Sequence, residues 1–164
     1  MQVAIINDTH CGVKNGSDVF LKNAEQFYTN VFFPYLKENN IDTILHLGDY
    51  FEHRKYVNFK ALNKNKKMFL DILRERGIHM SIIPGNHDVY YKNTNELNSL
   101  KELLCEYDDC VSIYEDPIDL KIDEMTIGMV PWICPENEDK CLDFLDNSKS
   151  NIIMGHFELG GFQY

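Results

Sequence analysis

The chain has 164 residues, of which 44% are hydrophobic and 26% charged, as in an ordinary globular domain with a sizeable core. Its net charge of −10 at pH 7 argues against a protein that binds nucleic acid through bulk positive charge. No apolar stretch approaches the roughly 20 residues needed to cross a bilayer, so we expect no membrane contact.

Charge is unevenly distributed along the chain. Six basic residues and no acidic residue lie between Arg54 and Lys67, whereas the segment 102–146 is strongly acidic. The basic segment could follow a DNA backbone, or it could be the solvated face of a helix. The sequence leaves both interpretations open.

The five cysteines are odd in number, and none lies in a CxxC pair. A strand is predicted from about Val3, which leaves no room for a signal peptide. We therefore expect free thiols in a reducing compartment, the cytoplasm of the cell or of a viral host, and no structural zinc site.

Seven strands are predicted from apolar runs. The first three alternate with helices. The next three follow one another closely with turn residues between them, which indicates an antiparallel set. Together these patterns indicate an α/β sandwich. In chain order the predicted strands are 2–6, 41–47, 78–83, 111–114, 118–122, 125–130 and 151–154.

Two long helices are predicted between the first three strands. The first starts near Ser17 and is kinked or split at Pro34, which has no backbone donor. The second is capped by Asn58 and ended by Gly77. Shorter helices are expected near 97–104 and 141–145. The predicted apolar faces of the long helices comprise Phe20, Ala24, Phe27, Val31, Leu36, Phe59, Leu62, Phe69, Ile72 and Leu73.

Polar residues follow four of the predicted strands directly. In an α/β sheet such residues meet at one edge, where ligands bind. Four coincidences of this kind are hard to explain by packing alone, so we expect one shared site. The residues concerned are Asp8 and His10, Asp49, Asn86 with His87 and Asp88, and His156.

This set contains the donors of a metal site. Its two carboxylates, two imidazoles and one amide oxygen suit borderline divalent ions such as Mn, Fe or Zn better than Ca or Mg. These five ligands are Asp8, Asp49, His10, His156 and Asn86. Five ligands exceed the needs of one structural zinc, so we expect two ions about 3.5–4 Å apart, bridged by Asp49. Such a pair would yield a metal-bound hydroxide that attacks a phosphoester, and His87 would protonate the leaving oxygen.

The segments Asp8-x-His10, Gly48-Asp49, Gly85-Asn86-His87-Asp88 and Gly155-His156 resemble the first four motifs of the calcineurin-like metallophosphoesterases, which are αββα sandwiches. The residues around these motifs are similar to those of SbcD-type DNA-repair nucleases. The resemblance implies a manganese-dependent nuclease that cleaves DNA in recombination or repair. It also implies an SMC-like ATPase partner of the SbcC type, and allows a homodimer.

The resemblance also implies a role for each residue. Asp8, His10 and Asp49 would hold the first ion, and Asp49, Asn86 and His156 the second. His87 would be the catalytic acid. Glu52 occupies the position of a family Asp or His beside that histidine, so we expect its carboxylate to orient His87.

One family motif is missing from the sequence. The family carries a further Gly-His-x-His block downstream of His156, and the chain stops at Tyr164 without one. We therefore expect residues 1–164 to form a single but incomplete metallophosphoesterase domain. Its metal site would lack one imidazole for each ion, and the chain could be inactive by itself.

Two other functions fit parts of the pattern. The chain could be a metallophosphoesterase that acts on a small nucleotide or a phosphoprotein. It could also be a metal-free scaffold that binds proteins, although all the expected ligands are present. Of the remaining histidines, His46 lies inside a strand and is expected to be packed, and His53 is expected either in solvent or on a phosphate.

Overall fold

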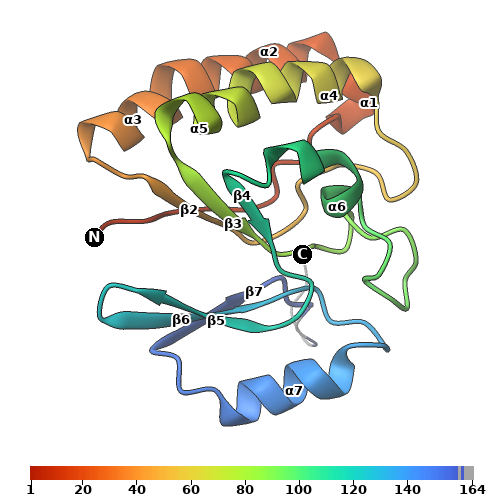
Figure 1. The fold of residues 1–164 in the computed structure, drawn as a ribbon. Helices are drawn as coiled ribbons and strands as arrows, with labels where there is room; N and C mark the ends of the chain where they lie inside the picture. The colour runs from red at the N-terminus through yellow and green to blue at the C-terminus, as the bar shows by residue number, and fades with distance from the viewer. Residues whose placement is uncertain (159, 161–164) are drawn as a thin grey trace.

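The computed structural model describes residues 1–158 and 160, and it is an αββα sandwich (Figure 1). Helices α2, α3, α4 and α5 cover one face of a first sheet, a second sheet packs against the other face, and α7 covers the outside of the second sheet. The expected fold is therefore confirmed.

The first sheet has the order β1-β2-β3-β4, and all of its strands are parallel. Ile6 pairs with His46 and His46 pairs with Ile82, so the first three strands end level with one another. The loops that carry the polar motifs consequently start side by side. The strands are β1 (Ala4–Ile6), β2 (Thr43–His46), β3 (His79–Ile82) and β4 (Val111–Ile113).

The second sheet has the order β5-β6-β7. β5 and β6 form the predicted antiparallel pair, and β7 runs parallel to β6. Val130 pairs with Gly155, so the end of β6 lies beside the end of β7, close to His156. These strands are β5 (Ile118–Ile122), β6 (Met125–Val130) and β7 (Ile152–Gly155).

The assignment of segment 111–114 to the antiparallel set is wrong. β4 belongs to the first sheet and runs parallel to β3. The chain returns through α6 (Ser99–Leu104) and a short 3₁₀ turn (Cys105–Tyr107), which makes a βαβ crossover. A short apolar strand carries no information about the sheet it joins, so the sequence pattern could not distinguish the two pairings.

The helical layer consists of two long, interrupted helices. The first comprises α2 (Asp18–Phe27), a π-helical turn (Tyr28–Phe32) and α3 (Phe33–Glu38), with Pro34 in the first turn of α3. The second comprises α4 (Phe59–Asn65), a π-helical turn (Lys66–Leu70) and α5 (Asp71–Arg76). The remaining helices are α1 (Val13–Gly16) and α7 (Glu138–Asn147). No helix in residues 1–158 is long and apolar enough to cross a membrane.

The predicted apolar face of the first helix is confirmed at Ala24 and Leu36, which pack in the core, and wrong at its other three positions. Phe20, Phe27 and Val31 are exposed, whereas Leu21 and Tyr28 are buried. Both stripes have helical spacing, so periodicity could not choose between them. The buried stripe wins because its aromatic rings pack on Phe69 of the second helix, with ring centroids 4.8–6.1 Å apart for Tyr28, Phe32 and Phe33. Phe59, also predicted to be buried, is 86% exposed.

The central strands of the first sheet, β2 and β3, are buried on both faces. Ile44, Met80 and Ile82 contribute to the core beneath the helices. Leu45 and Ile83 point the other way and pack with the second sheet. Burial on both faces explains the nearly continuous apolar runs of the parallel strands.

His46 is a fully buried polar residue at the end of β2. Its Nδ1 accepts a hydrogen bond from Gly48 N at 3.2 Å, so Nε2 carries the proton and faces Thr9 Oγ1 at 3.0 Å. Burial, with His156 and His10 nearby, lowers the pKa of His46 to about 3. The ring is therefore neutral in the folded protein and ties the loop after β1 to the loop after β2.

This burial predicts an acid-sensitive stability. The unfolded imidazole takes up a proton near pH 6.5 and the folded one only near pH 3, so the unfolded state binds an extra proton between these values. In EDTA, we expect the free energy of unfolding to fall below pH 6.5 by about 1.4 kcal/mol per pH unit more than in a His46→Gln variant. Urea denaturation followed by circular dichroism measures the difference, and parallel pH profiles would contradict it.

Candidate metal centre

Backbone hydrogen bonds join the loops that leave β1 and β2. Asp8 N donates to Gly48 O, and His10 N donates to Asp49 O, both at 3.0 Å. In the second sheet His156 N donates to Val130 O at 3.1 Å. These bonds bring residues far apart in the sequence to one rim between the two sheets.

The backbone of this rim is strained. Asp8, His10 and Asp49 have φ angles of 50°, 43° and 54°, in the left-handed region that residues with a side chain seldom occupy. Each such residue costs roughly 1–2 kcal/mol relative to ordinary conformations. Strain of this kind is typically concentrated at functional sites.

Two glycines allow the loops to meet. Gly48 has a φ angle of 97°, and a Cβ added there would lie 2.7 Å from the Gly85 backbone and 2.9 Å from His156 Nδ1. A Cβ at Gly85 would overlap the Asp49 carboxylate. The glycines of the two motifs are therefore required so that Asp49, Asn86 and His156 can come together.

Asp49 lies at the centre of the donors, and its side chain is 5% exposed. Its Oδ2 is 3.8 Å from His10 Nε2, and its Oδ1 is 3.6 Å from His156 Nε2. Two groups of donor atoms, each within 4.8 Å of one another, share this carboxylate. One comprises His10, Asp49 and His87, and the other comprises Asp8, Asp49 and His156.

The environment of His156 favours a cation. Its Nδ1 lies 2.9 Å from Leu47 O, which can only accept, so Nδ1 carries the proton. In the neutral ring the lone pair of Nε2 then faces Asn86 Oδ1 at 2.9 Å and the Asp49 carboxylate. Three acceptors that converge in this way repel one another unless a cation lies between them, and the donor set therefore fits a divalent metal.

His87 is oriented by a main-chain oxygen. Its Nδ1 donates to Glu52 O at 2.6 Å, which leaves Nε2 available for chemistry. Its backbone N–H donates to Asp49 Oδ1 at 2.8 Å, and its ring lies edge-on to His10 with centroids 5.0 Å apart. His87 thus lies beside the donor atoms of His10 and Asp49.

The expected contact between the Glu52 carboxylate and His87 is wrong. Glu52 Oε2 lies 3.1 Å from His10 Nδ1 instead. The backbone at Glu52 turns its carbonyl toward His87, and the carboxylate lies beside the neighbouring imidazole without the geometry of a hydrogen bond. The sequence could not tell which group of Glu52 faces which histidine.

Asp88 is a buried clamp below the site. Its carboxylate accepts hydrogen bonds from the backbone N–H groups of Tyr50, Phe51 and Gly85 at 2.9–3.2 Å. Burial raises the pKa of Asp88 to about 6, against the opposing effect of these bonds. Asp88 therefore holds the loop after β2 against the loop after β3. Thr9, whose hydroxyl contacts His46, is a supporting residue that no sequence pattern indicated.

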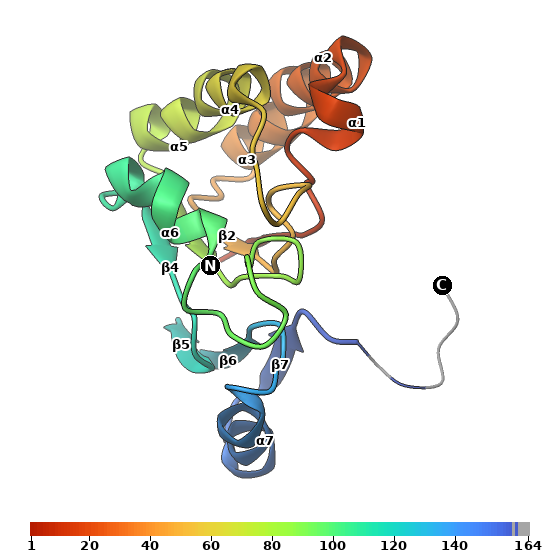
Figure 2. The same cartoon turned by 90° about the vertical axis from the view of Figure 1, so that its right-hand side faces the viewer.

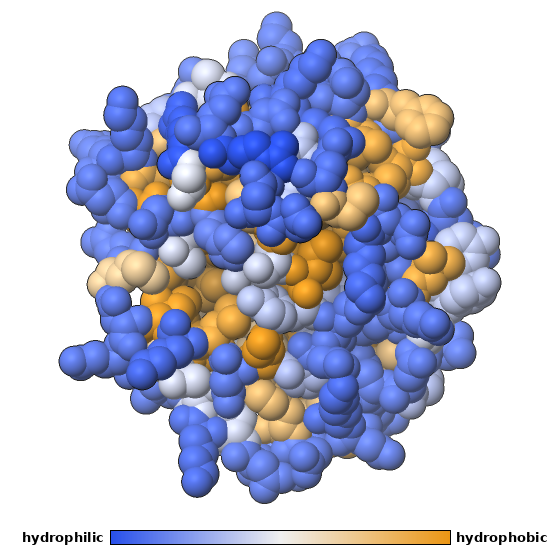
Figure 3. Space-filling view, viewed as in Figure 1, coloured by the Kyte–Doolittle hydropathy of each residue, from blue (hydrophilic) through white to orange (hydrophobic). Residues whose placement is uncertain are grey.

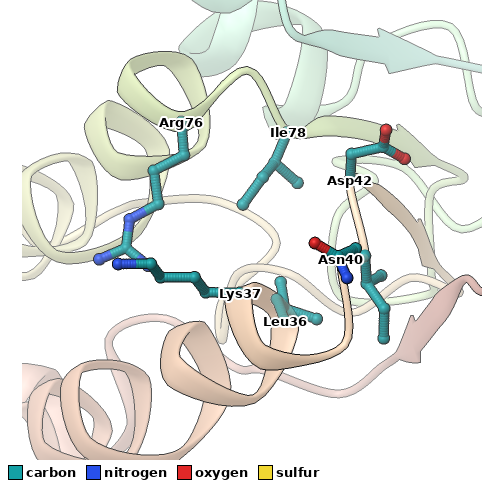
Figure 4. Close-up of a pocket in the computed structure, with 7 residues that line it drawn as sticks. Leu36, Lys37, Asn40, Asp42, Arg76 and Ile78 are labelled. Atoms are coloured by element: carbon teal, nitrogen blue, oxygen red, sulfur yellow. The ribbon is translucent and has the colours of Figure 1, made fainter.

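The donors of the second group open into a cavity of about 340 Å³. Asp8, Asp49, Asn86 and His156 line it, together with Glu158. Another cavity lies at the opposite ends of β2 and β3, where Lys37 and Arg76 extend on one side and Asp42 on the other (Figure 4). The candidate metal centre is thus at the carboxyl ends of the strands, as expected for an α/β sheet.

A protein of known sequence resembles this chain along its full length. "Exonuclease subunit 1" of Enterobacteria phage T4 is 32% identical over 164 residues, which are 100% of this chain and 48% of the phage protein. The chain thus spans about half the length of this relative.

Among solved structures, a protein of unknown function from Aquifex aeolicus has a TM-score of 0.52 at 20% identity, covering 97% of this chain and 80% of its own. The nuclease MPE of Pseudomonas putida has a TM-score of 0.48 at 16% identity, covering 78% and 52%. The calcineurin-like phosphoesterase model matches residues 1–164, so the chain belongs to that family.

Proposed function

We propose that this protein is a metal-dependent nuclease subunit that hydrolyses DNA phosphodiesters with two divalent ions. Manganese is the metal we propose for both ions. The observation that carries the proposal is the Asp49 carboxylate, which belongs to both groups of donor atoms. A shared carboxylate is typical of two-metal phosphoesterase sites. The name of the phage relative, an exonuclease subunit, favours DNA over a small phosphoester.

In this proposal Asp49 would help to hold both ions. His10 would bind on the Oδ2 side, and Asn86 and His156 on the Oδ1 side. Asp8 is near both, 3.8 Å from His10 and grouped with His156. When bound, the ions would polarise the phosphoryl oxygens and lower the pKa of water.

His87 would supply the proton for the leaving oxygen. The hydrogen bond from Nδ1 to Glu52 O fixes the ring and leaves Nε2 to hold or release a proton. The Glu52 carboxylate would support His10 from the side away from the metal, as carboxylates often support metal-binding histidines.

The word "subunit" in the relative's name also supports a partner. We propose an SMC-like ATPase of the SbcC type, acting with this protein in DNA recombination or repair in the cytoplasm of the cell or host. A homodimer of the nuclease is compatible with this assembly.

Asp49→Asn should abolish both metal binding and hydrolysis. The amide cannot bridge two cations, so we expect manganese affinity, measured by calorimetry, and cleavage of linear DNA to fall at least about 100-fold. Asp139→Asn, an exposed aspartate on α7, is the matched control and should behave as wild type. Wild-type hydrolysis of small phosphoesters without cleavage of DNA would overturn the proposed substrate.

His87→Asn should lower turnover without weakening manganese binding. Because His87 is assigned to proton transfer, we expect turnover on DNA to fall about 10²–10⁴-fold while manganese affinity changes less than about twofold. Loss of manganese binding in this variant would instead make His87 a metal ligand.

Glu52→Gln should weaken manganese binding and leave turnover at saturating manganese unchanged. The variant keeps the main-chain oxygen that holds His87 but loses the charge beside His10, so manganese affinity should weaken about 10-fold. With manganese at saturation, turnover should recover and its pH profile should match wild type. A shifted pH profile at saturating metal would show that the Glu52 carboxylate acts on His87.

A further inference from the structure

An apolar groove of about 470 Å³ is lined in part by the loops that also carry residues of the candidate metal centre. One wall is segment 53–57, which directly follows Glu52, and the other includes Tyr90, three residues after His87. Leu62 of α4 and Leu103 of α6 contribute apolar surface between them. Figure 2 shows the loops after β2 and β3 running beside each other, below α4 and to the right of α6. The loops that carry the site therefore also form this groove, which we call the aromatic groove.

Aromatic rings at the groove face solvent. Phe59, the first residue of α4, is 86% exposed, and Tyr56 is 56% exposed. The Tyr56 ring stacks on His53, with centroids 4.4 Å apart and planes 27° apart, so it is held in place. Figure 3 shows hydrophobic side chains gathered on the face that carries α4 and α6, among hydrophilic ones. Clustered exposed rings of this kind indicate a binding surface.

The groove also carries positive charge. Lys55 Nζ lies 5.4 Å from the centre of the Tyr90 ring, and Arg54 lies 5.1 Å from that of Trp132. Arg54 and Lys55 both line the groove, and their positive charges suit the phosphates of a nucleic acid. In a chain with a net charge of −10, Glu102 is the single acidic residue among those lining the groove.

We infer that the aromatic groove binds an unpaired DNA strand and leads its end to the metal centre, an inference that rests on the proposed nuclease function. Exposed rings that alternate with cations match the bases and phosphates of a single strand. A duplex hides the faces of its bases within the stack, so the rings would add little to duplex binding. The groove would therefore select unpaired over paired ends.

Binding of fluorescein-labelled oligonucleotides in EDTA tests this without cleavage. For a 12-nucleotide single strand, we expect Phe59→Ala and Tyr56→Ala each to raise Kd about 5–10-fold, and Phe59→Trp, which keeps a ring, to restore binding. For a blunt duplex of the same length, the changes should stay below about twofold. Tyr35→Ala, which removes an aromatic ring 58% exposed on α3 at the far end of the helical layer, should leave both Kd values unchanged.

Charge gives a second measurement. Arg54→Gln should reduce the salt dependence of single-strand binding by about 0.7 in the slope of log K against log salt, as expected for the loss of one phosphate contact.

Equal losses on both substrates would show that the rings do not distinguish unpaired from paired DNA, and no loss in Phe59→Ala would show that they do not contact DNA. Either result would overturn the inference. Hydrolysis of bis(p-nitrophenyl) phosphate with manganese by the full-length wild-type protein tests the metal centre separately. Its absence would contradict the proposed function rather than the groove.

Discussion

The contact between the Gly48 and Gly85 backbones is the constraint on which the candidate site depends. With no side chain at either position, the loops after β2 and β3 approach closely enough for His87 N to donate to the Asp49 carboxylate. Even one methyl group would separate them by more than hydrogen bonds can span. The same contact admits His156 from the second sheet, so both sheets meet at this point.

Hydrogen bonds of two buried side chains offset the backbone strain at this point. Asp88 collects three backbone N–H groups from two loops, and neutral His46 links Thr9 to Gly48. Both residues are fully buried, so their bonds are shielded from competing water. This arrangement holds Asp49 in a left-handed conformation and leaves the more exposed Asp8 and His10 directed to the open side, which is the preorganisation that a metal site requires.

The sequence predicted the features that local chemistry determines. Apolar runs followed by polar residues located β1, β2, β3 and β7, and the parallel register then brings Asp8, Asp49 and Asn86 to one rim. The features it missed depend on packing partners. Segment 111–114 belongs to the first sheet instead of the antiparallel set. The two apolar stripes of the first helix have the same spacing, and only the packing on Phe69 shows which of them is buried. The direction of the Glu52 carboxylate likewise depends on a backbone turn that residue types do not encode.

The exposed position of Phe59 has a different explanation from the other errors in the apolar faces. Phe20 and Phe27 are exposed because the other apolar stripe of their helix packs in the core. Phe59 is instead in the first turn of α4, where Asn58 caps the helix and the following residue points outward. A base on Phe59 or Tyr56 and a phosphate at the candidate metal centre would belong to one DNA strand. Binding energy from the groove would then fix the position of the scissile bond, so the rings would contribute to turnover as well as to affinity.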